Sequence, residues 1–232
     1  MKKKVVVLSG AGVSAESGIS TFRDSGGLWD NYRVEDVATY EGWLRNRKLV
    51  LDFYNQRRKQ LLEVEPNAGH YELARLETAY DVHVITQNVD DLHERAGSQH
   101  VMHLHGELKK ARSTADPNYI IELDGWELNE GMTCPKGAQL RPHIVWFGEA
   151  VPMIEPAAEL CAGADYFIVV GTSLVVYPAA GLVNHVPQES PKYVVDPKEV
   201  YAPIHNVTCV KEPASSGLKK VVDELLHIAS RK

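Results

Sequence analysis

Residues 4–15 read Lys-Val-Val-Val-Leu-Ser-Gly-Ala-Gly-Val-Ser-Ala, a short β-branched run followed at once by a glycine-rich turn. The run from Lys4 to Leu8 predicts a buried strand. Gly10 to Ala15 then satisfies the pattern G-x-G-x-x-A, in which glycines allow a tight turn and let a pyrophosphate approach the start of a helix. Because the turn directly follows a strand, we interpret it as a nucleotide-binding turn, against the plainer alternative of a structural strand-to-helix connection.

Further β-branched runs alternate with segments of helical period along the chain. This alternation predicts an α/β fold with a Rossmann-like parallel sheet that helices cover on both faces. We expect the other strands at Val82 to Thr86, Tyr166 to Gly171, Tyr193 to Asp196 and Val207 to Val210, and helices at Gly42 to Val64, Asn67 to Ala79, Glu155 to Ala162 and Leu218 to Ala229.

Two stretches interrupt this alternation. They are Asp24 to Thr39 and Lys109 to Pro142, the second of which is polar and punctuated by glycine and proline. Long irregular inserts in a compact domain are usually functional loops or a small extra module. Together with the helix that starts at Gly42, we expect them to form a lid.

The composition excludes several classes of protein. A formal charge of −6 and a pI near 5.9 argue against binding to nucleic acid or to anionic lipid. No stretch reaches the roughly 18–20 apolar residues of a membrane helix, and the apolar run near the N-terminus is too short for a signal peptide, so we expect a cytoplasmic protein. The cysteines, Cys134, Cys161 and Cys209, are too few and too scattered for a disulfide framework or a four-thiolate metal site.

The residues after the glycine turn disfavour an ordinary dehydrogenase. Such an enzyme has a second apolar strand that ends in an acidic residue about 20 residues after the glycines. Residues 19–29 are instead polar and turn-rich, with Phe22, Arg23 and Trp29 among them. A loop of this kind suits covering a dinucleotide.

A polar cluster, Gln87-Asn88-Val89-Asp90-Asp91-Leu92-His93, follows the second expected strand. Ligands of open α/β sheets bind at this edge, although helix capping by Asn88 or Asp90 is the plainer alternative. His103 and His105 follow at strand spacing, and one histidine with a near-neutral pKa would suit a general base beside a ribose hydroxyl. The spacing of these histidines matches no established metal-ligand geometry, so we expect no metal.

Several blocks together resemble the sirtuin family, in the order that the family has them. They are residues 10–23, Gln87 to Asp90, His105-Gly106, Val145 to Glu149 and Gly171 to Ser173. The resemblance covers most of the chain and implies an NAD-dependent protein-lysine deacylase, with NAD and acylated lysine as its partners. It also implies one catalytic unit over residues 1–232, with a large Rossmann-like part at roughly 1–30, 66–106 and 146–232, and a small lid at roughly 31–65 and 107–145.

The resemblance assigns roles to the matching residues. His105 would be the general base, while Asn88 and Asp90 would order the ribose and the nicotinamide amide. Val145, Trp146, Phe147 and Gly148 would pair with the substrate peptide as an added strand and wall the acyl-lysine tunnel. With the three catalytic residues, the implied cofactor-binding positions are Gly10, Ala11, Gly12, Ser14, Ala15, Gly18, Phe22, Arg23, Trp29, Gln87, Val89, Gly171, Thr172, Ser173, Asp196 and Ala214.

Within the family, Tyr54 and Arg57 look like the pair of the subgroup that removes succinyl and malonyl groups. They stand three residues apart on an expected helix and so share a face. Arg57 can pair with a distal carboxylate while Tyr54 donates one more hydrogen bond. Ala38 matches the small residue that leaves room for a longer acyl chain. We therefore expect desuccinylase and demalonylase activity with some deacetylase activity.

The sequence departs from the family in its cysteines. Most sirtuins hold a structural zinc in the lid with two Cys-x-x-Cys pairs, but residues 107–139 contain only Cys134. Four thiolates cannot be assembled there, so we expect no zinc and a lid held by ordinary packing.

Two other classes of function stay open at this point. A non-catalytic module that binds NAD or ADP-ribose would keep the glycine turn but would not need His105. A protein ADP-ribosyltransferase would use the same activated ribose and transfer it to a protein side chain.

Overall fold

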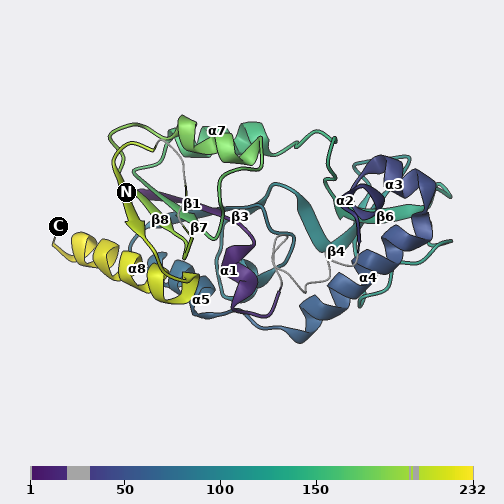
Figure 1. Cartoon of the computed structure of the whole chain (residues 1–232), viewed down its shortest axis with the longest axis horizontal. Helices are drawn as coiled ribbons and strands as arrows, with labels where there is room; N and C mark the ends of the chain where they lie inside the picture. Colours follow the sequence, from purple (N-terminus) through teal and green to yellow (C-terminus); the bar gives the residue numbers. More distant parts are fainter. Residues whose placement is uncertain (1, 20–31, 199, 201–203, 232) are drawn as a thin grey trace. The chain divides into compact units, whose positions relative to one another are not determined.

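The computed structural model describes residues 2–19, 32–198, 200 and 204–231. The chain separates into two compact units, which are drawn together in Figure 1. The first unit holds Met1–Gly18, Glu65–Leu104 and Val151–Lys232, and the second holds Ile19–Val64 and His105–Ala150. In the described part of the chain, no helix combines the length and the apolar character that crossing a membrane requires.

A parallel sheet of six strands forms the centre of the first unit, in the order β3-β2-β1-β7-β8-β9. Figure 1 labels β1, β3, β7 and β8 of this sheet. Its strand order reverses at β1, because β2 and β3 extend the sheet to one side and β7, β8 and β9 extend it to the other. Ligands of such sheets bind at the carboxyl ends of the strands, beside this switch point. The strands are β1 (Lys4–Ser9), β2 (Asp81–Thr86), β3 (Val101–His103), β7 (Tyr166–Val170), β8 (Lys192–Val195) and β9 (Val207–Val210).

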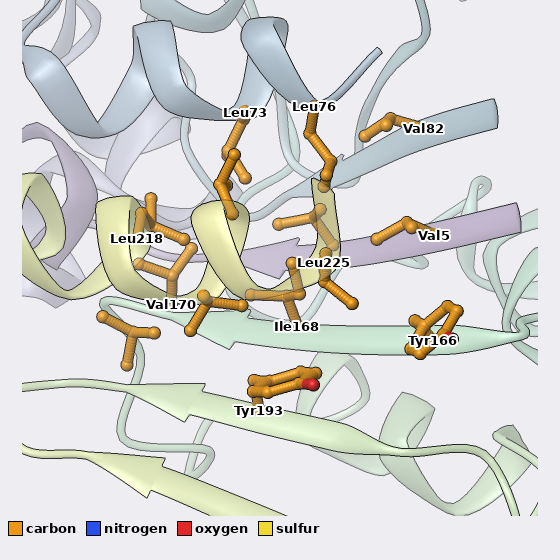
Figure 2. Packing of buried hydrophobic residues seen from close by; sticks show 14 of the residues in the cluster. Val5, Leu73, Leu76, Val82, Tyr166, Ile168, Val170, Tyr193, Leu218 and Leu225 are labelled. Carbon is orange, nitrogen blue, oxygen red and sulfur yellow. The ribbon is translucent and has the colours of Figure 1, made fainter. Parts of the chain in front are cut away.

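One face of the sheet packs against α5 (Ala68–Leu76) and α8 (Ala214–Ser230). Val5 and Val7 of β1 belong to this core cluster, and both are fully buried. Figure 2 shows how leucines of the two helices meet β-branched and aromatic side chains of the strands; the labelled residues are Val5, Leu73, Leu76, Val82, Tyr166, Ile168, Val170, Tyr193, Leu218 and Leu225. Helices from distant parts of the chain therefore share one core.

The opposite face packs against α7 (Ile154–Ala162) and the 3-10 helix η2 (Ala179–His185). Val6 and Leu8 belong to this second cluster, because successive side chains of a strand point to opposite faces. The run from Val5 to Leu8 is therefore apolar at every position. Helices cover both faces of a parallel sheet, which confirms the predicted fold class.

A three-stranded antiparallel sheet, in the order β5-β4-β6, forms the centre of the second unit. Its strands are β4 (Gly106–Ser113), β5 (Ile120–Glu122) and β6 (Leu140–Ile144). The small extra module expected for the lid is confirmed, although Lys109 to Pro142 contains strands of this sheet that the sequence analysis does not predict. Along most of β4, buried residues alternate with partly exposed ones, and the charged side chains occupy the more exposed positions. The strand therefore lacks a continuous apolar run.

The helices of the second unit begin with α2 (Val34–Val37), α3 (Tyr40–Arg45) and α4 (Arg47–Glu63). The single helix expected from Gly42 to Val64 is two helices, since Asn46 leaves helical geometry at φ −149°. The Asn46 side chain accepts a hydrogen bond from the Leu49 N–H at 3.1 Å and so caps the start of α4. Two further short helices, α1 (Gly12–Ala15) and α6 (Leu92–Arg95), lie in the first unit.

The boundaries of the two units differ from those expected at every junction, and two of these differences have a structural reason in the described residues. His105 and Gly106 belong to the second unit, because β4 starts at Gly106 and pairs with β6 there. Residues 146–150 also belong to the second unit, because the buried Trp146 ring packs with Trp43 at a centroid distance of 5.8 Å.

Two buried side chains of α4 fasten the segment between β5 and β6. The Asn55 carboxamide accepts from the Leu128 N–H at 2.9 Å and donates to the Leu128 carbonyl at 3.2 Å. Arg58 donates to the carbonyls of Leu108 at 2.6 Å and Trp126 at 2.5 Å, and to Asn55 Oδ1 at 2.9 Å. Burial lowers the pKa of Arg58 to about 10. These bonds tie the helix to β4 and to the loop.

Candidate active site

The turns that follow β1 and β7 are joined by their backbones. The Gly10 N–H donates to the Val170 carbonyl at 3.0 Å, and the Gly12 N–H donates to the Gly171 carbonyl at 2.9 Å. Both turns lie at the switch point of the sheet, where the topology places a ligand.

No side chain fits where these turns meet. A Cβ atom on Gly10 would lie 2.7 Å from Thr172 Cβ, and one on Gly12 would lie 2.7 Å from Gly171 Cα. Gly171 itself has φ +62°, and a Cβ there would lie 2.3 Å from the Val13 nitrogen. The glycines therefore let the two turns pack closely at the switch point, the place where a pyrophosphate binds in such sheets. The residues present fit a dinucleotide.

Ser14 lies at the centre of a buried polar cluster. Its hydroxyl donates to Asp90 Oδ2 at 3.0 Å and accepts from Asn88 Nδ2 at 3.1 Å. The other Asp90 oxygen accepts from the Leu92 N–H at 3.2 Å. Desolvation raises the pKa of Asp90, although the bonds from Leu92 and Ser14 oppose this shift. The structure thus brings together three residues that the sequence singles out, from the segments that follow β1 and β2.

His70 completes this cluster, although it is not among the residues that the sequence predicts for the site. The Asn67 N–H donates to His70 Nδ1 at 3.2 Å, so Nε2 carries the ring proton and points it at Ser14 Oγ, 3.4 Å away. Burial lowers the pKa of His70 to about 4, against a smaller opposing effect of Glu94. The histidine is therefore a neutral donor. Its signal in the sequence is the capping box that it forms with Asn67 at the start of α5.

Gln87 links the ends of β2 and β7. Its Nε2 donates to Thr172 Oγ1 at 3.1 Å, and the same Thr172 oxygen accepts from the Leu174 N–H at 3.3 Å. Ser173, between them, is exposed. Three predicted cofactor positions thus lie at the carboxyl edge of the sheet.

Two histidines near the polar cluster, His93 and His103, have structural partners. His93 is fully buried and lies 2.9 Å from the Ser9 hydroxyl, and burial lowers its pKa. His103 lies between the Asn88 carbonyl at 3.1 Å and Glu94 at 2.7 Å. Among the described residues, no group of three or more His, Cys, Asp or Glu side chains is arranged to hold a metal ion.

The remaining predicted cofactor positions are placed less specifically. Ala11 and Ala15 flank the Ser14 turn, Gly18 has φ +93°, and the half-buried Val89 lies between Asn88 and Asp90. Asp196 follows β8 and accepts from the Lys198 N–H at 2.8 Å, while the buried Ala214 begins α8. Phe22, Arg23 and Trp29 lie outside the described residues.

His105 lies in the second unit, immediately before β4. It is half-buried, and its carbonyl accepts from the Val145 N–H at 2.9 Å. Gly106 follows with φ +83°, and a Cβ there would lie 2.0 Å from the His143 carbonyl oxygen. The predicted base and the predicted substrate strand are therefore held together by backbone bonds of one unit.

Glu149 orders the predicted substrate strand. Its carboxylate pairs with Arg141 at 2.7 Å and with Arg112 at 3.2 Å, and it accepts from the Trp146 N–H at 2.8 Å. These bonds outweigh desolvation and lower the pKa of Glu149. Phe147 is 51% exposed, and its N–H donates to the Ala38 carbonyl at 3.0 Å. Glu149, the last residue of the motif Val145 to Glu149, thus fixes the backbone bend at which the exposed Phe147 lies.

Tyr54 and Arg57 lie on α4 in the same unit. Tyr54 is 1% exposed, and its hydroxyl accepts from Trp146 Nε1 at 3.0 Å. Burial raises the pKa of Tyr54 to about 12, although Arg57 opposes this rise. The Arg57 guanidinium lies 5.8 Å from the centroid of the Phe53 ring. Ala38, buried directly after α2, shares this unit.

Comparison with known proteins identifies relatives over nearly the whole chain. The Sir2 family model matches residues 10–178. A protein of Bacteroides thetaiotaomicron named NAD-dependent protein deacylase is 55% identical over 230 residues, covering 97% of this chain and 98% of the relative. A protein of the same name from Helicobacter pylori is 51% identical over 232 residues, covering 99% of this chain and 98% of the relative.

Solved structures of Sir2 homologues are also similar to this chain. A Sir2 homologue in complex with NAD has a TM-score of 0.88 at 38% identity, covering 98% of this chain and 91% of that chain. A mutant Sir2 homologue in complex with ADP-ribose has a TM-score of 0.91 at 38% identity, covering 100% of this chain and 95% of that chain. With its switch-point glycines, its buried Ser14 cluster and these matches, the chain belongs to the Sir2 family of sirtuins.

Proposed function

We propose that this NAD-dependent protein deacylase removes succinyl and malonyl groups, and also acetyl groups, from lysines of cytoplasmic proteins. The products are nicotinamide, O-acyl-ADP-ribose and the free lysine. The observation that carries the choice of acyl group is the pair on α4, where the Tyr54 hydroxyl is held by Trp146 and the Arg57 cation stands one turn later.

Charge complementarity supports an acidic acyl group. A guanidinium can take a distal carboxylate in two parallel hydrogen bonds, and a phenol can add a third. An acetyl group offers no charge for Arg57 to pair with. Because Tyr54 is buried, its hydrogen bond to a carboxylate would form away from competing water.

The cofactor would lie along the carboxyl edge of the sheet. NAD supplies the ribose carbon that the acyl oxygen attacks and the nicotinamide that leaves. Gly10, Gly12 and Gly171 let the two turns pack together at the switch point, beside which its pyrophosphate would lie. Asn88 and Asp90 would hold the ribose and the carboxamide. Their hydrogen bonds to Ser14 fix the orientation of both side chains.

His105 would act as the general base toward a ribose hydroxyl. The substrate peptide would add as a strand along Val145 to Gly148, where Glu149 holds the backbone in place. The lid would keep its shape without zinc, through bonds such as those of Asn55 and Arg58.

Mass spectrometry of one lysine peptide tests this proposal. The peptide carries acetyl, malonyl or succinyl, and it is incubated with the enzyme in the presence and absence of NAD. We expect NAD-dependent loss of all three groups, and Arg57→Met should abolish loss of the acidic groups selectively.

Other outcomes would point elsewhere. Removal of acetyl alone would refute the role of Tyr54 and Arg57. Transfer of label from NAD onto protein would favour an ADP-ribosyltransferase. NAD binding without turnover, unchanged in His105→Ala, would favour a binding module.

A further inference from the structure

The hydrogen bond from Trp146 decides where the proton of the Tyr54 hydroxyl points. The Trp146 indole N–H can only donate, so at 3.0 Å it makes the Tyr54 oxygen an acceptor. The proton of that hydroxyl must then point away from the indole. No described residue accepts this proton, and with a pKa of about 12 the phenol stays protonated. Tyr54 is therefore set as a hydrogen-bond donor before any substrate arrives.

Trp146 is itself firmly placed. The Arg141 guanidinium lies 3.4 Å from the centroid of its ring, and the Trp43 ring packs beside it at 5.8 Å. The Trp146 backbone N–H is bonded to Glu149, which also pairs with Arg141. The indole is 2% exposed. The N–H that faces Tyr54 therefore has a fixed direction.

We propose that Trp146 is a positioning residue for acyl selection, because its indole N–H aims the Tyr54 hydroxyl proton at the distal carboxylate of an acidic acyl group. This role differs from lining the acyl-lysine tunnel or pairing with the substrate peptide, because Trp146 acts through the side chain of Tyr54. It rests on the proposed removal of succinyl and malonyl groups. Because an acetyl group has no distal carboxylate, the role should appear in the ratio of succinyl to acetyl turnover.

A double-mutant cycle separates positioning from packing. The four proteins are the wild type, Trp146→Phe, Tyr54→Phe and the double variant, and the measured quantity is the ratio of kcat/KM for succinyl-lysine to that for acetyl-lysine. Phenylalanine keeps an aromatic ring for Arg141 but removes the N–H. We expect Trp146→Phe to lower the ratio about fivefold, as befits a weakened hydrogen bond to a charged group. In the Tyr54→Phe background it should lower the ratio no further.

Two further proteins guard against effects of folding and size. Trp43→Phe makes the same change in the neighbouring indole, which is not bonded to Tyr54, and it should leave the ratio unchanged. If Trp146→Phe does not fold, replacing Trp146 with benzothienylalanine removes only the N–H and retains the bicyclic ring. It should lower the ratio to the same extent.

The possible results are distinguishable. An unchanged ratio in Trp146→Phe, or an equal fall in both Tyr54 backgrounds, would overturn the role of Trp146. If Arg57→Met still lowers the ratio in that case, the proposed function stays intact. If Arg57→Met does not change the ratio either, the proposed acyl preference and the role of Trp146 both fail.

Discussion

Replacing Asn55 with alanine should destabilise the protein through the loop that Asn55 holds. Its carboxamide satisfies both backbone groups of Leu128, a residue that is 0% exposed, at 2.9 and 3.2 Å. It also accepts from Arg58 Nη1 at 2.9 Å. Alanine leaves the Leu128 N–H and carbonyl buried without these partners.

The magnitude follows from those two groups. Each buried polar group without a partner costs about 1–3 kcal/mol, so the pair costs about 2–6 kcal/mol. Alanine returns about 0.5 kcal/mol because it is a better helix former than asparagine. We expect the free energy of unfolding to fall by about 1.5–5.5 kcal/mol, and Tm to fall by at least about 3 °C at this chain length.

Urea unfolding followed by tryptophan fluorescence measures this loss. Trp43, Trp126 and Trp146 all lie in the second unit, so the signal reports on the part of the chain that Asn55 stabilises. Gln56→Ala is the matched control, since it removes a neighbouring exposed amide whose bond to the Tyr32 hydroxyl is long at 3.4 Å. It should change stability by less than about 0.5 kcal/mol. An Asn55→Ala loss no larger than that of the control would refute the reasoning.

Three other results are expected. The pKa of His70 falls from 6.5 to about 4 on folding, so the unfolded chain takes up a proton at a higher pH than the folded chain does, and stability decreases as the pH falls through this window. His70→Gln, which keeps an acceptor for the Asn67 N–H, should remove up to about 1.4 kcal/mol per pH unit of that slope, measured by urea unfolding at several pH values; an unchanged slope would contradict the assignment. Gly171→Ala should weaken NAD binding at least about tenfold in calorimetry, because its Cβ would lie 2.3 Å from the Val13 nitrogen, whereas Gly125→Ala, with φ +94° but no atom within 4 Å, should not; equal effects would mean that backbone strain and not the contact matters. Dialysis against a chelator should leave Tm and deacylation unchanged, and elemental analysis that finds one zinc per chain would disprove the zinc-free lid.

Much of the first unit could be predicted because its strands are apolar on both faces. A run such as Val5 to Leu8 has no other plausible place than a buried parallel strand. The second unit is harder to predict from the sequence, since β4 carries lysines and an arginine on its less buried side and resembles a loop in composition. The break at Asn46 was missed because helical periodicity continues through it, and only the capping bond from Leu49 shows where α4 begins.

The candidate site shows the same division. Ser14, Asn88 and Asp90 were found because they follow strands, and the topology brings those ends together. His70 was missed because its partner Ser14 lies 56 residues away in the sequence, and no local pattern links them. The hydrogen bond between Trp146 and Tyr54 spans 92 residues and was equally invisible, although both residues had been singled out for other reasons.

The central place of β1 also affects how the protein is made. Its partners are β2, at Asp81–Thr86, and β7, at Tyr166–Val170, so during synthesis one side of this strand stays open until most of the chain has emerged. The second unit, by contrast, is complete once Ala150 has been made. An apolar strand that waits with an open edge can pair with other nascent chains. Lys2 and Lys3, immediately before the strand, and Lys4, its first residue, supply the clustered charge that discourages such pairing.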